Sequence, residues 1–125
     1  MNGRKKQSTG RGGMERETFA FYDLPKISLN QFYGGIHWSK RKKIKDRYKF
    51  IIKSQTSKVI DYPCDVEYEF WFKSRPLDCS NACGGMVKLI EDCLFVDDSY
   101  KMVRSIKISS QKRKDDIVFI RVIPA

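Results

Sequence analysis

Hydrophobic and polar residues follow one another in patterns that predict four strands and two helices. Segments rich in β-branched and aromatic residues predict strands at 17–24, 66–72, 102–108 and 117–123. Apolar residues at helical spacing predict one helix from Trp38 to the break at Tyr62-Pro63, and a second helix over 80–94. The order β-α-β-α-β-β predicts an α+β fold, a single domain with a mixed sheet and two helices packed on it. We expect the last two strands to pair as a hairpin across the charged turn at 111–114.

The second predicted helix has polar residues along one line and apolar residues opposite. At about 100° per residue, Asn81, Lys88 and Asp92 fall within roughly 20° of one line, which leaves an apolar back for the sheet. Gly84 and Gly85 flank that line, although two glycines cost a helix interior about 1 kcal/mol each. Either another backbone, of protein or nucleic acid, approaches the helix there, or the helix begins irregularly near the glycines.

Length and composition fit one folded domain. The chain has 125 residues, of which 41% are hydrophobic and 13% aromatic, as is typical of a globular protein with one modest core. No apolar run approaches the roughly 20 residues of a transmembrane helix, and no secretory signal follows the basic N-terminus, so we expect a cytoplasmic protein without a membrane partner. Residues 1–13 are rich in glycine and bases and predict a disordered tail, which leaves 14–125 as the domain.

The cysteines do not predict a zinc site. None of Cys64, Cys79, Cys83 and Cys93 forms a C-x-x-C pair, and the chain has a single histidine. We therefore expect reduced, mostly buried thiols.

Positive charge is concentrated in the first half of the chain. Residues 1–60 hold 15 Lys and Arg against 4 Asp and Glu, whereas residues 61–125 hold 10 against 11. A cationic surface suits a polyanion, because neutralised phosphates release condensed counterions. The first predicted helix sets the acid Asp46 against Lys40, Arg41, Lys42, Lys43, Lys45, Arg47, Lys49 and Lys53. A solvated amphipathic helix is the alternative, although such helices usually mix both signs.

Acidic residues flank the second predicted helix at both ends. Asp78 precedes it, and Asp97 and Asp98 follow it, with Lys88 between them. If these carboxylates converge, their oxygens suit a hard cation such as Mg²⁺ or Mn²⁺. Ordinary turns and surface ion pairs are the alternative explanation for the same aspartates.

The acidic segment resembles the core of a known nuclease family. RusA-type Holliday-junction resolvases have the pattern D-x-D-N-x-x-K-x-x-x-D-x-L followed by a D-D pair. Similar residues here are Leu77-Asp78-x-x-Asn81, Lys88-x-x-x-Asp92-x-Leu94 and Val96-Asp97-Asp98-Ser99. Ser28-Leu29-Asn30 and the basic run from His37 to Lys43 are similar to phage-encoded members. The resemblance implies a phage or prophage protein in a bacterial cell, a homodimer that binds four-way junctions and makes paired cuts with Mg²⁺.

The resemblance also implies roles for individual residues. Asp78, Lys88 and Asp98 would be catalytic, and the metal would be held by Asp78, Asp92, Asp97 and Asp98. The metal would activate water, and Lys88 would stabilise charge on the phosphate. An ion pair between Lys88 and Asp92 at i,i+4 is the alternative for that lysine.

Two departures from the family pattern affect the expected site. Ser80 stands where the family has its second aspartate, and Glu67 or Glu69 on the neighbouring strand could replace that ligand if its side chain faces the site. Lys88 lies about one helical turn farther from Asn81 than the family lysine does from its asparagine.

DNA would be bound mainly through phosphates on the first helix. The residues expected to bind it are Trp38, Lys40, Arg41, Lys42, Lys43, Lys45, Arg47 and Asn81. Phe32, Tyr33 or Trp38 would stack at a junction centre, unless these rings pack in the core.

Two other classes of function fit part of the pattern. A non-catalytic, structure-selective nucleic-acid-binding protein with a degenerate metal site would explain the basic half of the chain without a metal. A protein-interaction role, in which the basic helix docks an acidic partner, would explain the charge alone. None of the three predicts a small-molecule substrate.

Overall fold

Four strands and two helical units make up the part of the fold that the structure describes. The computed structural model describes residues 16–29, 38–96 and 99–125, so the tail predicted at 1–13 lies outside the described residues. The strands are β1 (Glu17–Tyr22), β2 (Cys64–Phe72), β3 (Val103–Lys112) and β4 (Ile117–Pro124). The helical segments are α2 (Trp38–Gln55), α3 (Cys79–Ala82), the π-helical turn η1 (Cys83–Val87) and α4 (Lys88–Leu94). Because α3, η1 and α4 follow one another without a break, the predicted α+β order and mixed sheet with two helices are confirmed.

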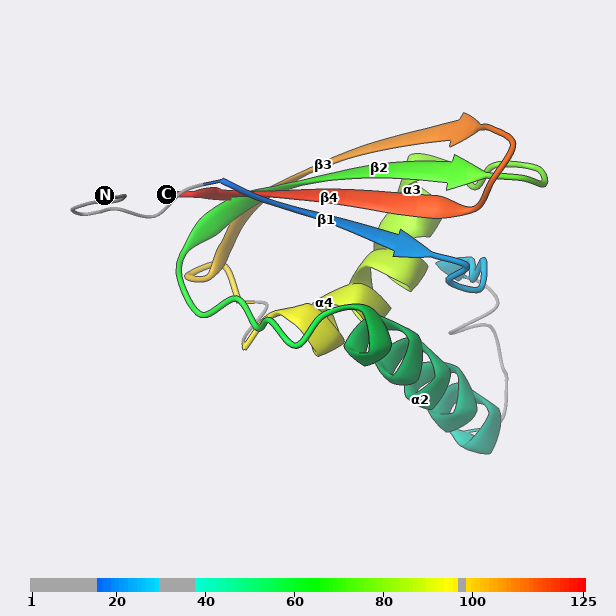
Figure 1. Cartoon of the computed structure of the whole chain (residues 1–125), viewed down its shortest axis with the longest axis horizontal. Coiled ribbons are helices and arrows are strands. Elements are labelled where there is room, and N and C mark those ends of the chain that lie inside the picture. Colours follow the sequence, from blue (N-terminus) through cyan, green and yellow to red (C-terminus); the bar gives the residue numbers. More distant parts are fainter. Residues whose placement is uncertain (1–15, 30–37, 97–98) are drawn as a thin grey trace.

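The strands form one sheet in the order β1-β4-β2-β3 (Figure 1). β2 runs antiparallel to β4 and parallel to β3, which the chain reaches through the helix over 79–94. The predicted hairpin of the last two strands is wrong, because β2 lies between them. Their link crosses the end of β2, where the Arg113 amide donates to the Phe72 carbonyl at 2.9 Å and the Lys73 amide donates to the Asp116 carboxylate at 2.8 Å.

The central position of β2 follows from its side chains. Alternate residues of this strand are buried against the helices, namely Cys64, Val66, Tyr68, Phe70 and Phe72. The rings of the last three stack at centroid distances of 5.9 to 6.0 Å. A strand with this continuous apolar row is best shielded from water when another strand pairs with each of its edges.

Both helical units cover the same face of the sheet, and α2 packs against α4 (Figure 1). Tyr48 and Ile52 of α2 and Ile90 and Leu94 of α4 are fully buried there. The Tyr48 hydroxyl donates to the Pro25 carbonyl, which attaches α2 to the segment after β1. Within the ranges that the structure describes, no helix is both long and apolar enough to span a bilayer.

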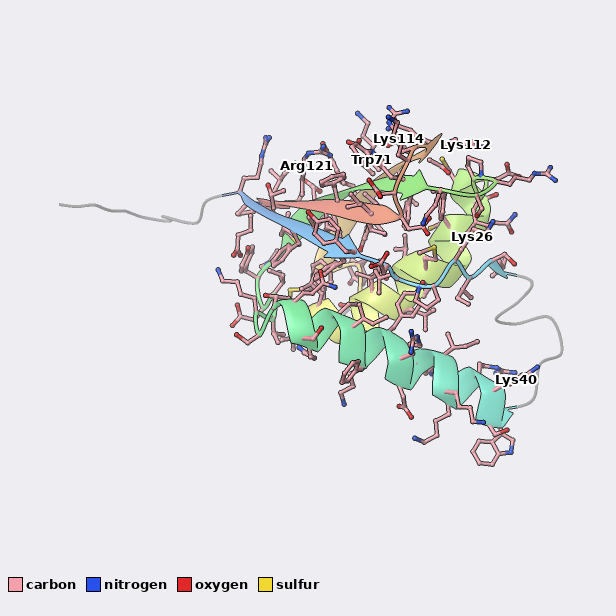
Figure 2. All side chains as sticks on the ribbon, turned by 45° about the vertical axis from the view of Figure 1, so that its right-hand side comes forward. Lys26, Lys40, Trp71, Lys112, Lys114 and Arg121 are labelled. Atoms are coloured by element: carbon pink, nitrogen blue, oxygen red, sulfur yellow. The ribbon has the colours of Figure 1, made fainter. Side chains whose placement is uncertain are left out.

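The opposite face of the sheet carries a network of polar and aromatic side chains (Figure 2). Arg121 of β4 donates to Glu69 at 2.8 Å and lies 3.8 Å from Glu67, both on β2. Trp71 packs edge-on against Phe119 with ring centroids 4.9 Å apart. Because side chains alternate along β2, Glu67 and Glu69 point away from the helices. The expectation that either glutamate replaces the missing ligand beside the helix is therefore wrong.

Candidate nucleic-acid interface and metal site

α2 presents basic side chains to solvent over most of its length. The helix has 18 residues, which at 1.5 Å per residue makes it about 27 Å long. Six residues predicted to bind DNA are exposed on it: Trp38, Lys40, Lys42, Lys43, Lys45 and Arg47. Arg41 is half-buried. The structure therefore brings most of the predicted DNA contacts onto the surface of one helix.

Asn81 is not part of that surface. It is half-buried on α3, whereas α2 packs against α4. The projection that aligned Asn81 with Lys88 and Asp92 assumed a regular α-helix, but the intervening residues 83–87 form a π-helical turn. A π turn bonds each residue to the fifth along the chain instead of the fourth, so it rotates α4 relative to α3.

The paired glycines lie where another segment of this chain approaches η1. A Cβ on Gly85 would lie 2.6 Å from the Ile27 carbonyl oxygen and 3.0 Å from the Ser28 carbonyl carbon. A Cβ on Gly84 would lie 2.5 Å from a terminal carbon of the Leu29 side chain. The prediction of a close backbone at the glycines is confirmed, and that backbone belongs to the protein itself.

Glu91 is a buried carboxylate that lies between Lys88 and Asp92 in the sequence of α4. Its side chain is 2% exposed, and its Oε1 lies 3.9 Å from the Nζ of the exposed Lys88. The ion pair of Lys88 thus runs to Glu91 at i,i+3 and not to Asp92 at i,i+4. Sequence analysis missed Glu91 as a core residue because, on a regular helix, this position falls at the border of the apolar face.

Two titratable side chains of β2 lie close enough to Glu91 for its charge to raise their pKa values. Burial raises the pKa of Tyr68 well above its ordinary value, and Glu91 raises it further. Burial, followed by Asp65 and Glu91, raises the pKa of the Cys64 thiol to about 11. The buried Tyr68 hydroxyl has no hydrogen-bond partner among the described residues. Both groups therefore stay protonated at neutral pH, and Glu91 is the carboxyl that the described core buries under α4.

Asp78 begins the helix without capping it. Its backbone is extended (φ −62°, ψ 150°), and its carboxylate makes no hydrogen bond to the first turn, although aspartate at this position commonly does. β3 holds this corner, because the Ser110 hydroxyl donates to the Leu77 carbonyl at 2.5 Å and the Cys79 thiol donates to the Ile108 carbonyl at 3.5 Å. The exposed carboxylate of Asp78 is thus available to a ligand from solvent.

The structure does not bring Asp78 and Asp92 together. They are 14 residues apart at opposite ends of a continuous helix, a separation of about 21 Å at 1.5 Å per residue. Oxygens bound to one Mg²⁺ lie within about 4 Å of each other. Among residues 16–29, 38–96 and 99–125, no three His, Cys, Asp or Glu residues are grouped so that they could hold a metal. Asp97 and Asp98 lie outside the described residues.

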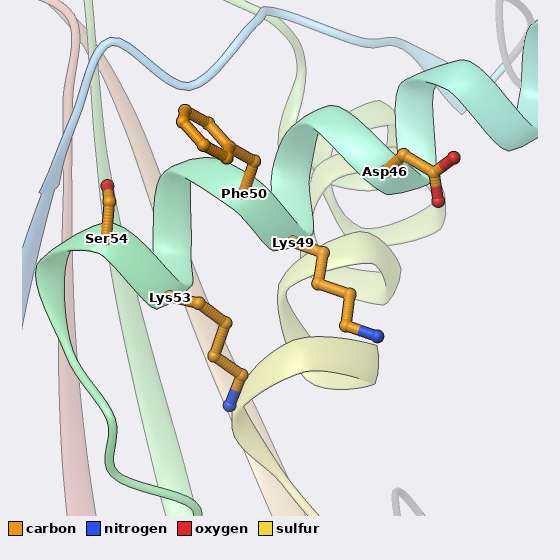
Figure 3. A pocket seen from close by; sticks show the side chains of 5 residues that line it. All are labelled: Asp46, Lys49, Phe50, Lys53 and Ser54. Atoms are coloured by element: carbon orange, nitrogen blue, oxygen red, sulfur yellow. The ribbon is translucent and has the colours of Figure 1, made fainter.

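A groove with a volume of about 320 Å³ lies between α2 and α4. Its charged lining residues are Lys45, Asp46, Lys49, Lys53 and Asp92. A second hollow of about 510 Å³ shares Asp46, Lys49 and Lys53 with it and adds Phe50 and Ser54 (Figure 3). Phe50 is 74% exposed. Sequence analysis missed this ring, although its place among the lysines, off the buried face of the helix, was a usable signal.

The remaining predicted aromatic and thiol groups have mixed outcomes. Phe32 and Tyr33 lie outside the described residues, whereas Trp38 is 68% exposed and does not pack in the core. All four cysteines are free, as expected. Only Cys64 is fully buried, while Cys79 is exposed and Cys83 and Cys93 are half-buried, so the prediction of mostly buried thiols is wrong.

No protein-family model matches the chain, and no curated protein matches it. The resemblance to RusA-type resolvases stays a prediction from the motif residues.

Proposed function

We propose that this protein is a Mg²⁺-dependent endodeoxyribonuclease that cuts four-way or other branched DNA junctions, as RusA-type resolvases do. The observation that carries the proposal is the exposed basic surface of α2. This helix packs against α4, which bears Lys88 and Asp92. Contacts to phosphates position DNA without reading its sequence. Such contacts suit a substrate that is defined by its branching.

Lys88 is the residue of the described chain that best fits a role at the phosphate. Its exposed ammonium group would stabilise charge that develops on the phosphate, and the buried Glu91 carboxylate lies 3.9 Å from that ammonium. Mg²⁺ would activate water and neutralise phosphate charge. The described acids alone do not fit a metal centre, so Asp97 or Asp98 would have to complete a site with Asp92, or else with Asp78.

Cleavage of a labelled synthetic four-way junction, in Mg²⁺ and in EDTA, tests the proposal. We expect paired nicks that disappear in EDTA and fall at least about 100-fold in Lys88→Met, since loss of one charge-stabilising group has that effect. Asp98→Asn and Asp78→Asn test the two candidate ends of the helix separately. Asp115→Asn, an exposed aspartate of the link between β3 and β4, is the matched control and should cut like the wild type.

Light scattering of the same preparation tests the homodimer that paired cuts require. A mass of two chains is the expected result. A monomer that still makes paired nicks would contradict the dimer and leave the nuclease standing.

The separation of Asp78 from Asp92 favours a second candidate, a non-catalytic protein that binds branched DNA. Ser80 in place of an expected ligand points the same way. Tight junction binding with no cut in either Mg²⁺ or Mn²⁺ would establish this candidate and exclude the nuclease. Binding that ignores DNA shape and persists at high salt would instead favour an acidic protein partner.

A further inference from the structure

Three lysines form a row along the side of α2 that faces α4. Lys45, Lys49 and Lys53 are spaced four residues apart, so they lie on one line of the helix at intervals of about 6 Å. All three line the groove between the two helices. Figure 3 shows the side chains of Lys49 and Lys53 directed toward α4. The row therefore forms one wall of the groove.

The groove keeps a positive charge despite its two acids. Asp46 pairs with Lys42 at 2.9 Å, outside the lysine row. Lys49 and Lys53 line the groove together with Asp92 of α4, so that positive charge exceeds negative charge along this stretch of the described lining.

Phe50 adds an aromatic surface next to the lysine row. Its ring is 74% exposed and lines the second hollow together with Lys49 and Lys53. The ring contributes nothing to the core at that exposure. Nucleic-acid grooves that track a single strand combine a regular series of positive charges with exposed aromatic rings on which bases stack. In a duplex the base faces are already stacked on one another and are not accessible to such a ring.

We propose that the groove between α2 and α4, together with the adjoining hollow that Phe50 lines, binds a single DNA strand, with phosphates along Lys45, Lys49 and Lys53 and a base stacked on Phe50. The inference rests on the proposed function for its choice of DNA as the ligand. It goes further by naming an unpaired strand, such as the one exposed at a branch point, as what the groove binds. An acidic protein segment would use the lysines and gain little from Phe50.

Fluorescence anisotropy with labelled oligothymidylate and a blunt duplex, both in EDTA, tests this groove separately from cleavage. Phe50→Ala should weaken oligothymidylate binding about 5- to 150-fold, the loss of one base stack, and leave duplex binding unchanged. Phe50→Trp should retain the affinity. Replacing the three lysines with glutamine should reduce the dependence of log K on log salt by about 2, because each phosphate contact contributes about 0.7 on a single strand.

The matched control removes the same charge from β3 and the turn that precedes it. Lys101, Lys107 and Lys112 are exposed, and the last is labelled in Figure 2 on the far side of the molecule from α2. Their replacement by glutamine should leave oligothymidylate binding as in the wild type. An equal loss of oligothymidylate affinity in the control, or unchanged oligothymidylate binding in Phe50→Ala, would overturn the proposal that the groove binds a single strand. Circular dichroism of each variant verifies that the fold is intact.

The two proposals fail in different experiments. If the wild type cuts junctions and the groove variants bind oligothymidylate normally, the groove is wrong and the nuclease stands. If the groove variants lose oligothymidylate and the wild type cuts nothing, the groove stands and the nuclease is wrong. If polyglutamate displaces DNA with the same dependence on the lysines and Phe50 has no effect, the groove is a site for acidic protein and the inference is overturned.

Discussion

Gly85 occupies a position with no room for a side chain. A Cβ there would come within 2.6 Å of the Ile27 carbonyl oxygen. The atoms that it would meet belong to the backbone of the opposing segment, so they cannot rotate away as a side chain can. We expect Gly85→Ala to destabilise the fold by about 1–3 kcal/mol, as overpacking of a core does, although alanine is the better helix former. Urea unfolding of the wild type and the variant measures the difference.

Gly84→Ala is the matched control for that substitution. Its Cβ would meet the end of the Leu29 side chain, which can rotate away. The gain in helix propensity, about 1 kcal/mol, should offset much of the remaining crowding. Equal losses in the two variants would contradict the assignment of Gly85 to a backbone contact.

The thiols of Cys64 and Cys79 should react at very different rates. Burial, together with Asp65 and Glu91, raises the pKa of Cys64 to about 11, so at neutral pH it stays a protonated thiol. Cys79 is exposed. Because the thiolate is the nucleophile, iodoacetamide should alkylate Cys79 in the native protein and Cys64 only after unfolding, as peptide mass spectrometry would measure. Comparable alkylation of both thiols under native conditions would refute this.

Among the structural elements, η1 determines which residues of α4 face the core. The turn rotates α4 so that Glu91 is buried while Lys88 and Asp92 remain exposed one turn apart. An uninterrupted α-helix would have placed Asn81 on their line. The same turn holds Gly84 and Gly85, where the segment after β1 approaches. One local irregularity thus sets both the packing of that segment and the residues that α4 offers to a ligand.

Strands β2 and β4 are joined across the open face by an ion pair with a predictable pH dependence. The hydrogen bond from Arg121, and then that from Trp71, hold the pKa of Glu69 below its ordinary value of 4.5. A lowered folded-state pKa stabilises the fold above pH 4.5, and that contribution is lost as the pH falls through the folded value. Arg121→Gln should therefore cost about 1 kcal/mol at neutral pH.

The difference between wild type and Arg121→Gln should shrink as the pH falls below about 4. Thermal unfolding of both proteins from neutral pH to about pH 3 measures it. A difference that stays constant over this range would mean that Arg121 acts through packing on β2 and not through the Glu69 carboxylate. Arg121→Met, which keeps most of the apolar stem, separates those two contributions.

For the whole molecule, the sequence predicts the kinds of element well and their pairing less well. Alternation in β2 and periodicity in α2 are local signals, and both elements form there, although α2 ends at Gln55, before the predicted break at Tyr62-Pro63. The hairpin of β3 and β4 was predicted from a short charged turn, which is also a local signal. The observed order depends on which strand can shield the row from Cys64 to Phe72, and that requirement involves strands far apart in sequence.

For the candidate site, too, local features could be predicted from the sequence, and features that depend on tertiary packing could not. The exposed bases of α2 could be predicted, because charge on one side of a regular helix projects outward whatever the helix packs against. The burial of Glu91 could not, since a π turn has no clear signature in one sequence. Whether carboxylates at the two ends of a helix converge is a question of tertiary distance, and spacing along the chain does not answer it. The groove between α2 and α4 likewise exists only once the two helices are packed.

The position of β4 constrains the order in which a newly synthesised chain can fold. Among the described strands, β1 pairs with β4 alone, and their register joins Glu17 to Val122, which are far apart in the sequence. As the ribosome extends the chain, β2, the helix over 79–94 and β3 can associate early, since they are consecutive. β1 must wait, unpaired, until residues 117–124 have left the exit tunnel and inserted between it and β2. Until then, the nascent protein carries an unpaired first strand on which a chaperone could act.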